Sequence, residues 1–143
     1  MNWVFLSLLS AFFAGLTATV SKIGLKNVDS SVGFAIQSVV ILLLTWGYIG
    51  VSGKSRQLTE IEPKAWAWLL LSGVITTCAY LAYFAAIKAG DVSRVAPLDR
   101  LSLVFAIVFA VLFLGDKING PTIFGASLMA IGALVIGVAG ASK

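Results

Sequence analysis

Ionisable and hydrogen-bonding side chains are rare in the apolar parts of this sequence, and four of them could do chemistry there. Asp99 and Arg100 are adjacent, near the start of the apolar stretch Val95–Leu114. Lys22 follows a second apolar stretch, and Gln37 lies inside a third. A carboxylate, two cations and an amide can bind a polar solute, or form ion pairs that break and re-form. We expect these four residues to lie on a substrate path or in ion pairs.

Other reactive groups are almost absent from the sequence. It has no histidine, which removes imidazole metal ligands and the commonest general base. Its single cysteine, Cys78, cannot form an intrachain disulfide or a two-cysteine metal site. No nucleophile is paired with a base. We therefore expect no catalytic residue, no metal site and no cofactor, and an enzyme is the least expected class.

The composition indicates that these polar residues belong to a membrane protein. Of the 143 residues, 59% are hydrophobic and 11% are charged, and the mean hydropathy is +1.02. A small soluble domain could not hide that much apolar surface. This excludes a cytosolic enzyme, a nucleic-acid-binding domain and a secreted disulfide scaffold. The net charge of +4 fits lysines and arginines that flank membrane spans, and we expect no nucleic-acid partner.

Five apolar stretches are long enough to cross a bilayer, which takes about 20 residues. They are Trp3–Ser21, Ser31–Val51, Ala65–Ile87, Val95–Leu114 and Pro121–Gly140. Spanning segments must satisfy their backbone groups internally, and no alternating strand pattern is present, so we predict five transmembrane helices. The connections are too short to hold another domain, so we predict one membrane domain over residues 1–143. No positive charge precedes the first stretch, which argues against a cleaved signal peptide.

The position of Asp99 and Arg100 depends on where the fourth helix begins. The 14 residues from Leu101 to Leu114 give about 21 Å of helix, which is short of a hydrocarbon core of about 30 Å. The helix must therefore extend back past both residues, which places them about 6–8 Å inside the boundary. The alternative is an interfacial position, with Arg100 reaching the headgroups and Asp99 capping the helix after Pro97.

Other polar and aromatic residues also allow two interpretations, one functional and one structural. Lys22 faces a cavity or only marks the end of its helix, and Gln37 contacts substrate or hydrogen-bonds a neighbouring helix. Tyr80, Tyr83 and Phe84 share one helix face, where they either line a cavity or serve packing.

The last span is rich in small residues that would allow two helix backbones to approach closely. They are Gly125, Ala126, Ala130, Ala133 and Gly137. We assign them to helix packing, either within one chain or between two subunits.

The odd number of spans places the two termini on opposite sides of the membrane. The loops on the Met1 side carry about four positive charges and the other side about six. Without Arg100 and Lys143 the two sides are equal at about four each, so the orientation is weakly determined. Both insertions of one chain would give two inverted subunits, an arrangement that many transporters build from internal repeats. We therefore predict a homodimer, with an antiparallel pair and dual topology favoured.

Several motifs resemble the EamA domain of the drug/metabolite transporter superfamily. They are Val95–Ser102 (VAPLDRLS), Leu114–Lys117 (LGDK), the small-residue last helix, and Ser21–Leu25 (SKIGL) at the end of the first span. The chain resembles the short, five-span members over nearly its whole length. The resemblance implies an inner-membrane transporter, multi-pass in a bacterial plasma membrane, that exports or exchanges a small metabolite or drug-like solute by alternating access.

The sequence also departs from related patterns. Short relatives often carry an arginine where this chain has Gln37, and another near Ala85, so an anionic substrate is less safe to infer. The four-span multidrug-resistance branch carries a carboxylate in its first helix, and this chain has none there. Two other functions remain open, namely a flippase or flippase subunit for a lipid-linked substrate, and a non-transport membrane scaffold.

Overall fold

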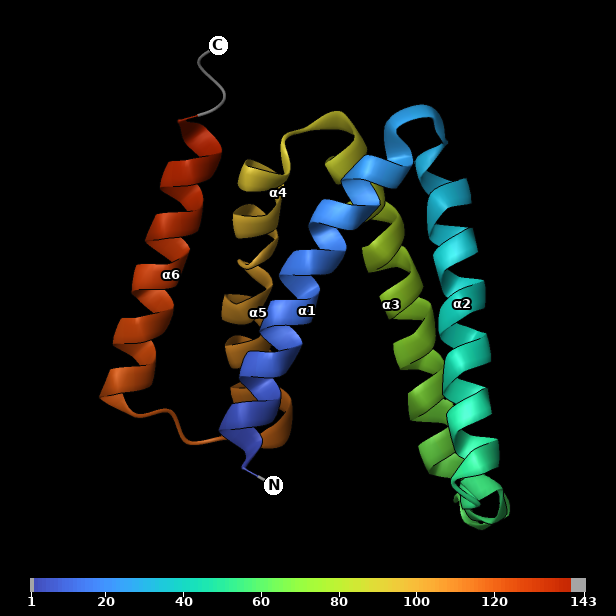
Figure 1. Cartoon of the computed structure of the whole chain (residues 1–143). Coiled ribbons are helices and arrows are strands. Elements are labelled where there is room, and N and C mark those ends of the chain that lie inside the picture. Colours follow the sequence, from blue (N-terminus) through green and yellow to red (C-terminus); the bar gives the residue numbers. More distant parts are fainter. Residues whose placement is uncertain (1, 140–143) are drawn as a thin grey trace. The chain divides into compact units, whose positions relative to one another are not determined.

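A computed structural model describes residues 2–139, and these residues form an all-helical structure (Figure 1). The elements in chain order are α1 (Trp3–Gly24), the 3-10 helix η1 (Leu25–Asn27), α2 (Ser30–Val51), the 3-10 helix η2 (Lys54–Glu60), α3 (Pro63–Ala89), α4 (Val92–Asp99), α5 (Ser102–Phe109), the π-helix η3 (Ala110–Leu114) and α6 (Gly120–Val138).

Five segments are long and apolar enough to cross a membrane, which confirms the prediction of five helical spans. They are Trp3–Asn27, Ser30–Val51, Pro63–Ala89, Val92–Leu114 and Gly120–Val138. The fourth segment consists of α4, α5 and η3 in series, where the sequence predicted one continuous helix. The predicted end of the fifth span, Gly140, lies outside the described residues.

The side chains that the fold buries are few and apolar. In the part of the chain that the structure describes, the buried side chains are Ala18, Leu25, Phe84, Ile87 and Ala133, and no polar or charged residue is buried. Large apolar side chains such as Leu44 and Phe113 lie on the surface instead. In water such a surface would be unstable, whereas lipid chains solvate it.

The helices fall into two compact units. One contains the described residues of Met1–Lys22 and Ala89–Lys143, and therefore most of α1 with α4, α5, η3 and α6. The other contains Ile23–Lys88, and therefore η1, α2, η2 and most of α3. The organisation of the chain as one domain stays a prediction.

Within the second unit, hydrogen bonds fix the turn between η1 and α2. Asp29 caps α2, because its Oδ1 accepts a hydrogen bond of 2.8 Å from the backbone N–H of Ser31. The hydrogen bonds from Ser31, and more weakly the charge of Lys88, hold the pKa of the Asp29 carboxyl below its usual value. The Nζ of Lys88 donates to the carbonyl oxygen of Val28 at 2.7 Å, which ties the end of α3 to this turn.

A close approach of η1 and α2 requires the glycine at position 33. A Cβ built on Gly33 would overlap Cδ2 of Leu25, a side chain that is 3% exposed. The Leu25 side chain therefore occupies the space that any larger residue at position 33 would need.

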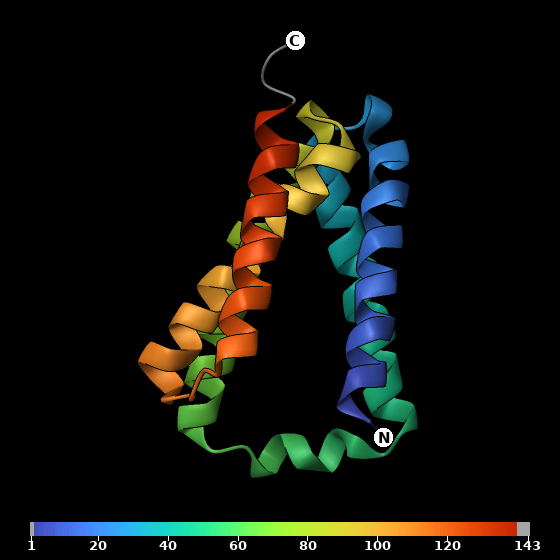
Figure 2. The same ribbon diagram turned by 90° about the vertical axis from the view of Figure 1, so that its left-hand side faces the viewer.

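The connection between α2 and α3 is helical, as Figure 2 shows where η2 runs between the ends of the two long helices. Gly53, with a φ of 68°, reverses the chain after α2. The Thr59 hydroxyl donates to the Arg56 carbonyl oxygen at 2.8 Å and so closes the end of η2. The next helix, α3, begins at Pro63, three residues after the end of η2.

Within the first unit, α6 begins at a well-formed cap and packs along α4 and α5. The Asn119 side chain accepts a hydrogen bond of 3.0 Å from the backbone N–H of Thr122, and Pro121 stands in the first turn, where its missing N–H costs nothing. Further along, the place that a Cβ on Gly137 would take lies 3.0 Å from Cδ1 of Leu98, so α6 approaches α4 closely at that point.

Candidate functional site

The fourth span is interrupted at the two charged residues that the sequence singles out. α4 ends at Asp99 and α5 begins at Ser102, and Arg100 lies in the turn between them. Pro97 has no N–H, so the usual hydrogen bond to the carbonyl of Ser93 is missing. The helix then tightens, because the N–H of Arg100 bonds to the carbonyl oxygen of Pro97 at 3.1 Å, three residues back.

The charges at this interruption are not neutralised by any residue that the structure describes. Asp99 and Arg100 are exposed, and neither side chain has a hydrogen bond or ion pair with any residue between 2 and 139. Arg100 follows the first residue of the Val92–Leu114 segment by eight residues, which is about 12 Å along a helix with a rise of about 1.5 Å per residue. Asp99 does not cap α5, whose N-cap position is Leu101 without a side-chain bond. Asp99 and Arg100, which have no partner among the described residues, therefore lie where the helix of a membrane-spanning segment is interrupted.

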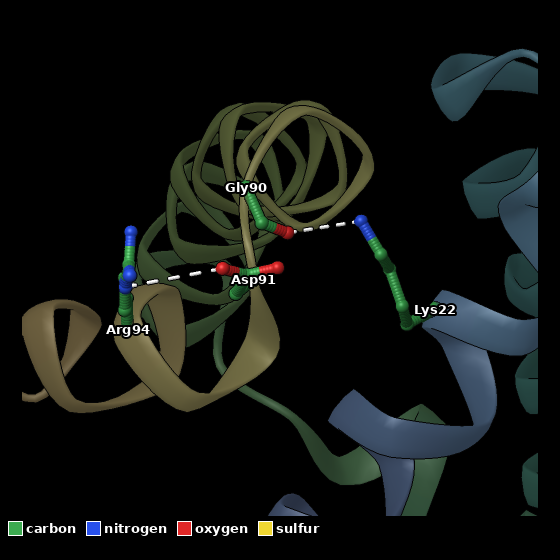
Figure 3. A network of polar contacts seen from close by, with 4 residues as sticks. All are labelled: Lys22, Gly90, Asp91 and Arg94. Atoms are coloured by element: carbon green, nitrogen blue, oxygen red, sulfur yellow. Dashed lines mark hydrogen bonds and ion pairs between the residues drawn. The ribbon is translucent and has the colours of Figure 1, made fainter. Parts of the chain in front are cut away.

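Lys22 binds the turn between α3 and α4. Its Nζ donates to the carbonyl oxygen of Gly90 at 2.9 Å, and the Lys22 side chain is partly buried (Figure 3). Beside this bond, Nε of Arg94 lies 3.8 Å from Oδ2 of Asp91. Lys22 thus holds the end of α1 against the start of α4.

The Asp91–Arg94 ion pair is a feature that the sequence interpretation missed. The three-residue spacing of the two opposite charges, directly after Gly90, is the signal that could have indicated the pair. Both side chains are substantially exposed, so the pair itself contributes little stability.

We expect replacement of Lys22 by methionine to loosen the turn between α3 and α4. Loss of a hydrogen bond of this kind costs about 1 kcal/mol, which corresponds to about fivefold faster amide exchange in a segment that opens locally. Hydrogen–deuterium exchange of residues 90–95 in detergent measures this. Lys22→Arg should restore slow exchange, and Lys26→Met, at an exposed neighbouring lysine, should leave it unchanged. Equal exchange in Lys22→Met and the parent protein would show that the bond does not hold the turn.

The aromatic residues predicted to line a cavity lie in the second unit, where they pack α3 against α2. The ring of Tyr80 stacks on that of Phe34, with centroids 5.6 Å apart and planes 6° apart, and Phe84 lies 5.4 Å from Phe34. Tyr83 meets Tyr80 edge-on at 6.4 Å. Phe84 is 2% exposed and Tyr80 is 40% exposed. The sequence interpretation missed Phe34, which joins this cluster from α2.

Gln37 lies one turn after Phe34 on α2, and its side-chain oxygen has no partner. The Oε1 atom is buried and accepts no hydrogen bond from any described residue. The helices of the second unit therefore supply no hydrogen bond to this oxygen, and the role of Gln37 stays a prediction. An unpaired acceptor is unusual in a protein interior, since nearly all buried polar groups are bonded.

The small residues of α6 lie on the face toward α4 and α5. Ala133 is buried, and Gly125, Ala126, Ala130 and Gly137 are half-buried. Between α5, η3 and α6 the same face borders an open apolar groove of about 490 Å³. Its lining residues are Leu103, Ala106, Ile107, Ala110, Thr122, Gly125, Ala126 and Met129.

Other reactive groups are sparse in the structure as well. Cys78, in the middle part of α3, is a free and exposed thiol. Among the residues that the structure describes, no three histidine, cysteine, aspartate or glutamate side chains lie together as metal ligands would.

Five apolar spans, one of them broken at charged residues, have the architecture of a membrane transporter. Residues 1–138 match the family model of the EamA-like transporter family. A protein from Sinorhizobium sp., named "Uncharacterized transporter in cobO 3'region", is 43% identical over 137 residues, which cover 96% of this chain and 97% of that protein. The chain therefore belongs to the EamA-like transporter family, as its motifs predicted, and is a multi-pass membrane transporter.

A second relative is longer than this chain. "Uncharacterized transporter sll1164" from Synechocystis sp. is 22% identical over 129 residues, which cover 89% of this chain and 37% of that protein. No solved structure matches the chain.

Proposed function

We propose that the protein moves a small metabolite or drug-like solute across the bacterial plasma membrane, and that the interrupted fourth span lies on its path. The observation that carries this proposal is that Asp99 and Arg100, at the interruption between α4 and α5, have no partner among the described residues. Charged groups in a membrane are costly and are retained where they contact water, solute or each other. Interrupted helices in transporters also offer backbone groups as ligands for polar solutes.

A transporter of this size needs a second copy to enclose a path. Five helices surround little space, and transporters commonly place their site between two inverted halves. The nearly equal positive charge on the two sides of the membrane favours insertion in both orientations. We therefore propose an antiparallel homodimer in which the two subunits exchange conformations to give alternating access.

The spans contain a single acidic side chain, Asp99, so passive transport or exchange fits these residues at least as well as proton antiport.

The open groove between α5, η3 and α6 supports a second candidate function. Its lining is almost entirely apolar, and all of its lining residues belong to membrane-spanning segments. Such a groove could hold the hydrocarbon part of a lipid-linked substrate while the headgroup crosses along the broken span. This would make the protein a flippase or a flippase subunit.

Reconstitution into liposomes tests the two candidates against each other. Vesicles loaded with a bacterial metabolite extract should lose at least one small solute faster than protein-free vesicles, as followed by mass spectrometry. A flippase would instead move a fluorescently labelled polyprenyl phosphate between leaflets without solute loss. If neither solute nor lipid moves, transport by this chain alone is wrong.

The homodimer is tested by topology reporters at the C-terminus. An antiparallel pair requires reporter activity on both sides of the membrane from one gene product. Activity on one side only would exclude it.

A further inference from the structure

The side chain of Gln37 presents a hydrogen-bond acceptor that nothing in the described chain uses. Its Oε1 is buried without a partner, about 10 Å along α2 from Ser30 and inside the Ser30–Val51 span. At this depth the bilayer supplies no water that could bond to it. A buried carbonyl oxygen without a hydrogen bond destabilises the fold. We therefore ask which donor bonds to this oxygen in the working protein.

The surroundings of Gln37 on its own helix face are aromatic. Phe34 precedes it by three residues, and so lies on the same side of α2. The Phe34 ring is stacked on Tyr80 of α3, and Tyr80 keeps 40% of its surface exposed. An unpaired acceptor next to a partly open ring stack can receive a molecule that has one donor group and one flat apolar part.

The charges at this end of the second unit disfavour a cationic donor. Lys26 and Lys88 lie there on η1 and α3, and Asp29 is the only acidic side chain near them in this unit. The Nζ of Lys88 donates a hydrogen bond to the carbonyl oxygen of Val28, which holds the lysine at this end of α2. A net positive field lowers the local concentration of cations, whereas an uncharged N–H or O–H group is unaffected.

We propose that Oε1 of Gln37 is the acceptor of a recognition subsite for amphipathic solutes that carry an uncharged N–H or O–H donor. The donor bonds to Gln37, and the apolar part of the solute lies against Phe34 and Tyr80. The subsite rests on the proposed transport function and narrows the class of its substrate.

Two matched amides probe this subsite in the purified full-length protein. Phenylacetamide has two N–H donors and a ring, and N,N-dimethylphenylacetamide has the same ring without a donor. We expect saturable binding of radiolabelled phenylacetamide in detergent, and binding of the dimethyl compound at least about tenfold weaker. Equal affinity for the two amides, or no saturable binding of either up to its solubility limit, would overturn the proposal.

Substitutions in α2 test whether Gln37 causes the preference for the amide with N–H donors. Gln37→Met keeps the length of the side chain and removes the acceptor, so it should lower the affinity for phenylacetamide about tenfold and leave that for the dimethyl compound unchanged. Its melting temperature without ligand should be equal to or above that of the parent, because an unpaired buried acceptor has been removed. Thr45→Val, at an exposed threonine on the same helix, is the matched control and should bind as the parent does.

The variants also separate this subsite from the transport proposal. If Gln37→Met binds both amides as the parent does, the subsite is wrong. It is also wrong if this variant melts at a lower temperature than the parent, because a water molecule or a second copy of the chain then normally donates a hydrogen bond to Oε1. Solute flux in liposomes that continues in that case would leave the transport function intact. Donor-selective binding without any flux would support the subsite and contradict transport.

Discussion

Replacement of Arg100 by glutamine should reduce solute flux in liposomes at least about tenfold. A charge-assisted hydrogen bond is worth about 1.5–3 kcal/mol, and 1.4 kcal/mol already corresponds to a factor of ten. Arg100 has no partner in the described chain, so its guanidinium is available to a solute or to a carboxylate that approaches in one state only. Asp99→Asn should lower flux for the same reason, and Asp99→Glu should retain more activity than Asp99→Asn.

The control for this experiment is a cation outside the spans. Arg56 lies in η2 and is exposed, and Arg56→Gln makes the same chemical change there. It should leave flux within about twofold of the parent, because screened surface charges contribute little. Unchanged flux in both Arg100→Gln and Asp99→Asn, with normal amounts of protein in the vesicles, would remove these residues from the solute path.

Replacement of Gly33 by leucine should destabilise the protein by about 1–3 kcal/mol, the usual cost of overpacking. The new Cβ would clash with Cδ2 of Leu25, so the buried Leu25 side chain would have to shift to make room. The turn that holds η1 against α2 would have to open. A thermal melt in detergent, followed by tryptophan fluorescence, should show the loss as a lower melting temperature.

A glycine on the same helix provides the matched comparison. A Cβ at Gly47 would meet nothing within 4 Å, so Gly47→Leu adds the same side chain at an open position of α2. Its melting temperature should equal or exceed that of the parent, since a glycine in a helix interior is less favourable than leucine. If the two variants melt alike, the contact between Gly33 and Leu25 does not limit stability.

The sequence was sufficient to predict the helices because each long apolar segment has only one structure available in a bilayer. The turn at Asn119 and Pro121 was also predictable, since its residue types cap and start a helix by local rules. The family motifs led to the correct family because each of them is a contiguous stretch of the sequence. The interruption of the fourth span went against the prediction, although Pro97 was visible in the sequence.

The candidate site was less predictable, because its geometry depends on residues far apart in the chain. Lys22 bonds to the backbone carbonyl of Gly90, and a backbone acceptor leaves no trace in the residue types. The burial of the Oε1 atom of Gln37 is likewise a result of tertiary packing. Periodicity placed Tyr80 and Phe84 on one face of a helix, but could not show that Phe34 of α2 completes their cluster.

The π-helix η3 allows a screw motion of the fourth span. In η3 the N–H of Gly115 bonds to the carbonyl of Ala110, five residues back, so the turn holds one residue more than an α-helical turn does. An α-helix advances by about 100° per residue. Conversion of η3 to α-helical bonding would therefore rotate α5 by about that angle relative to Gly115. Such a rotation would carry Arg100 to another side of the span, with an axial shift of only about 1.5 Å.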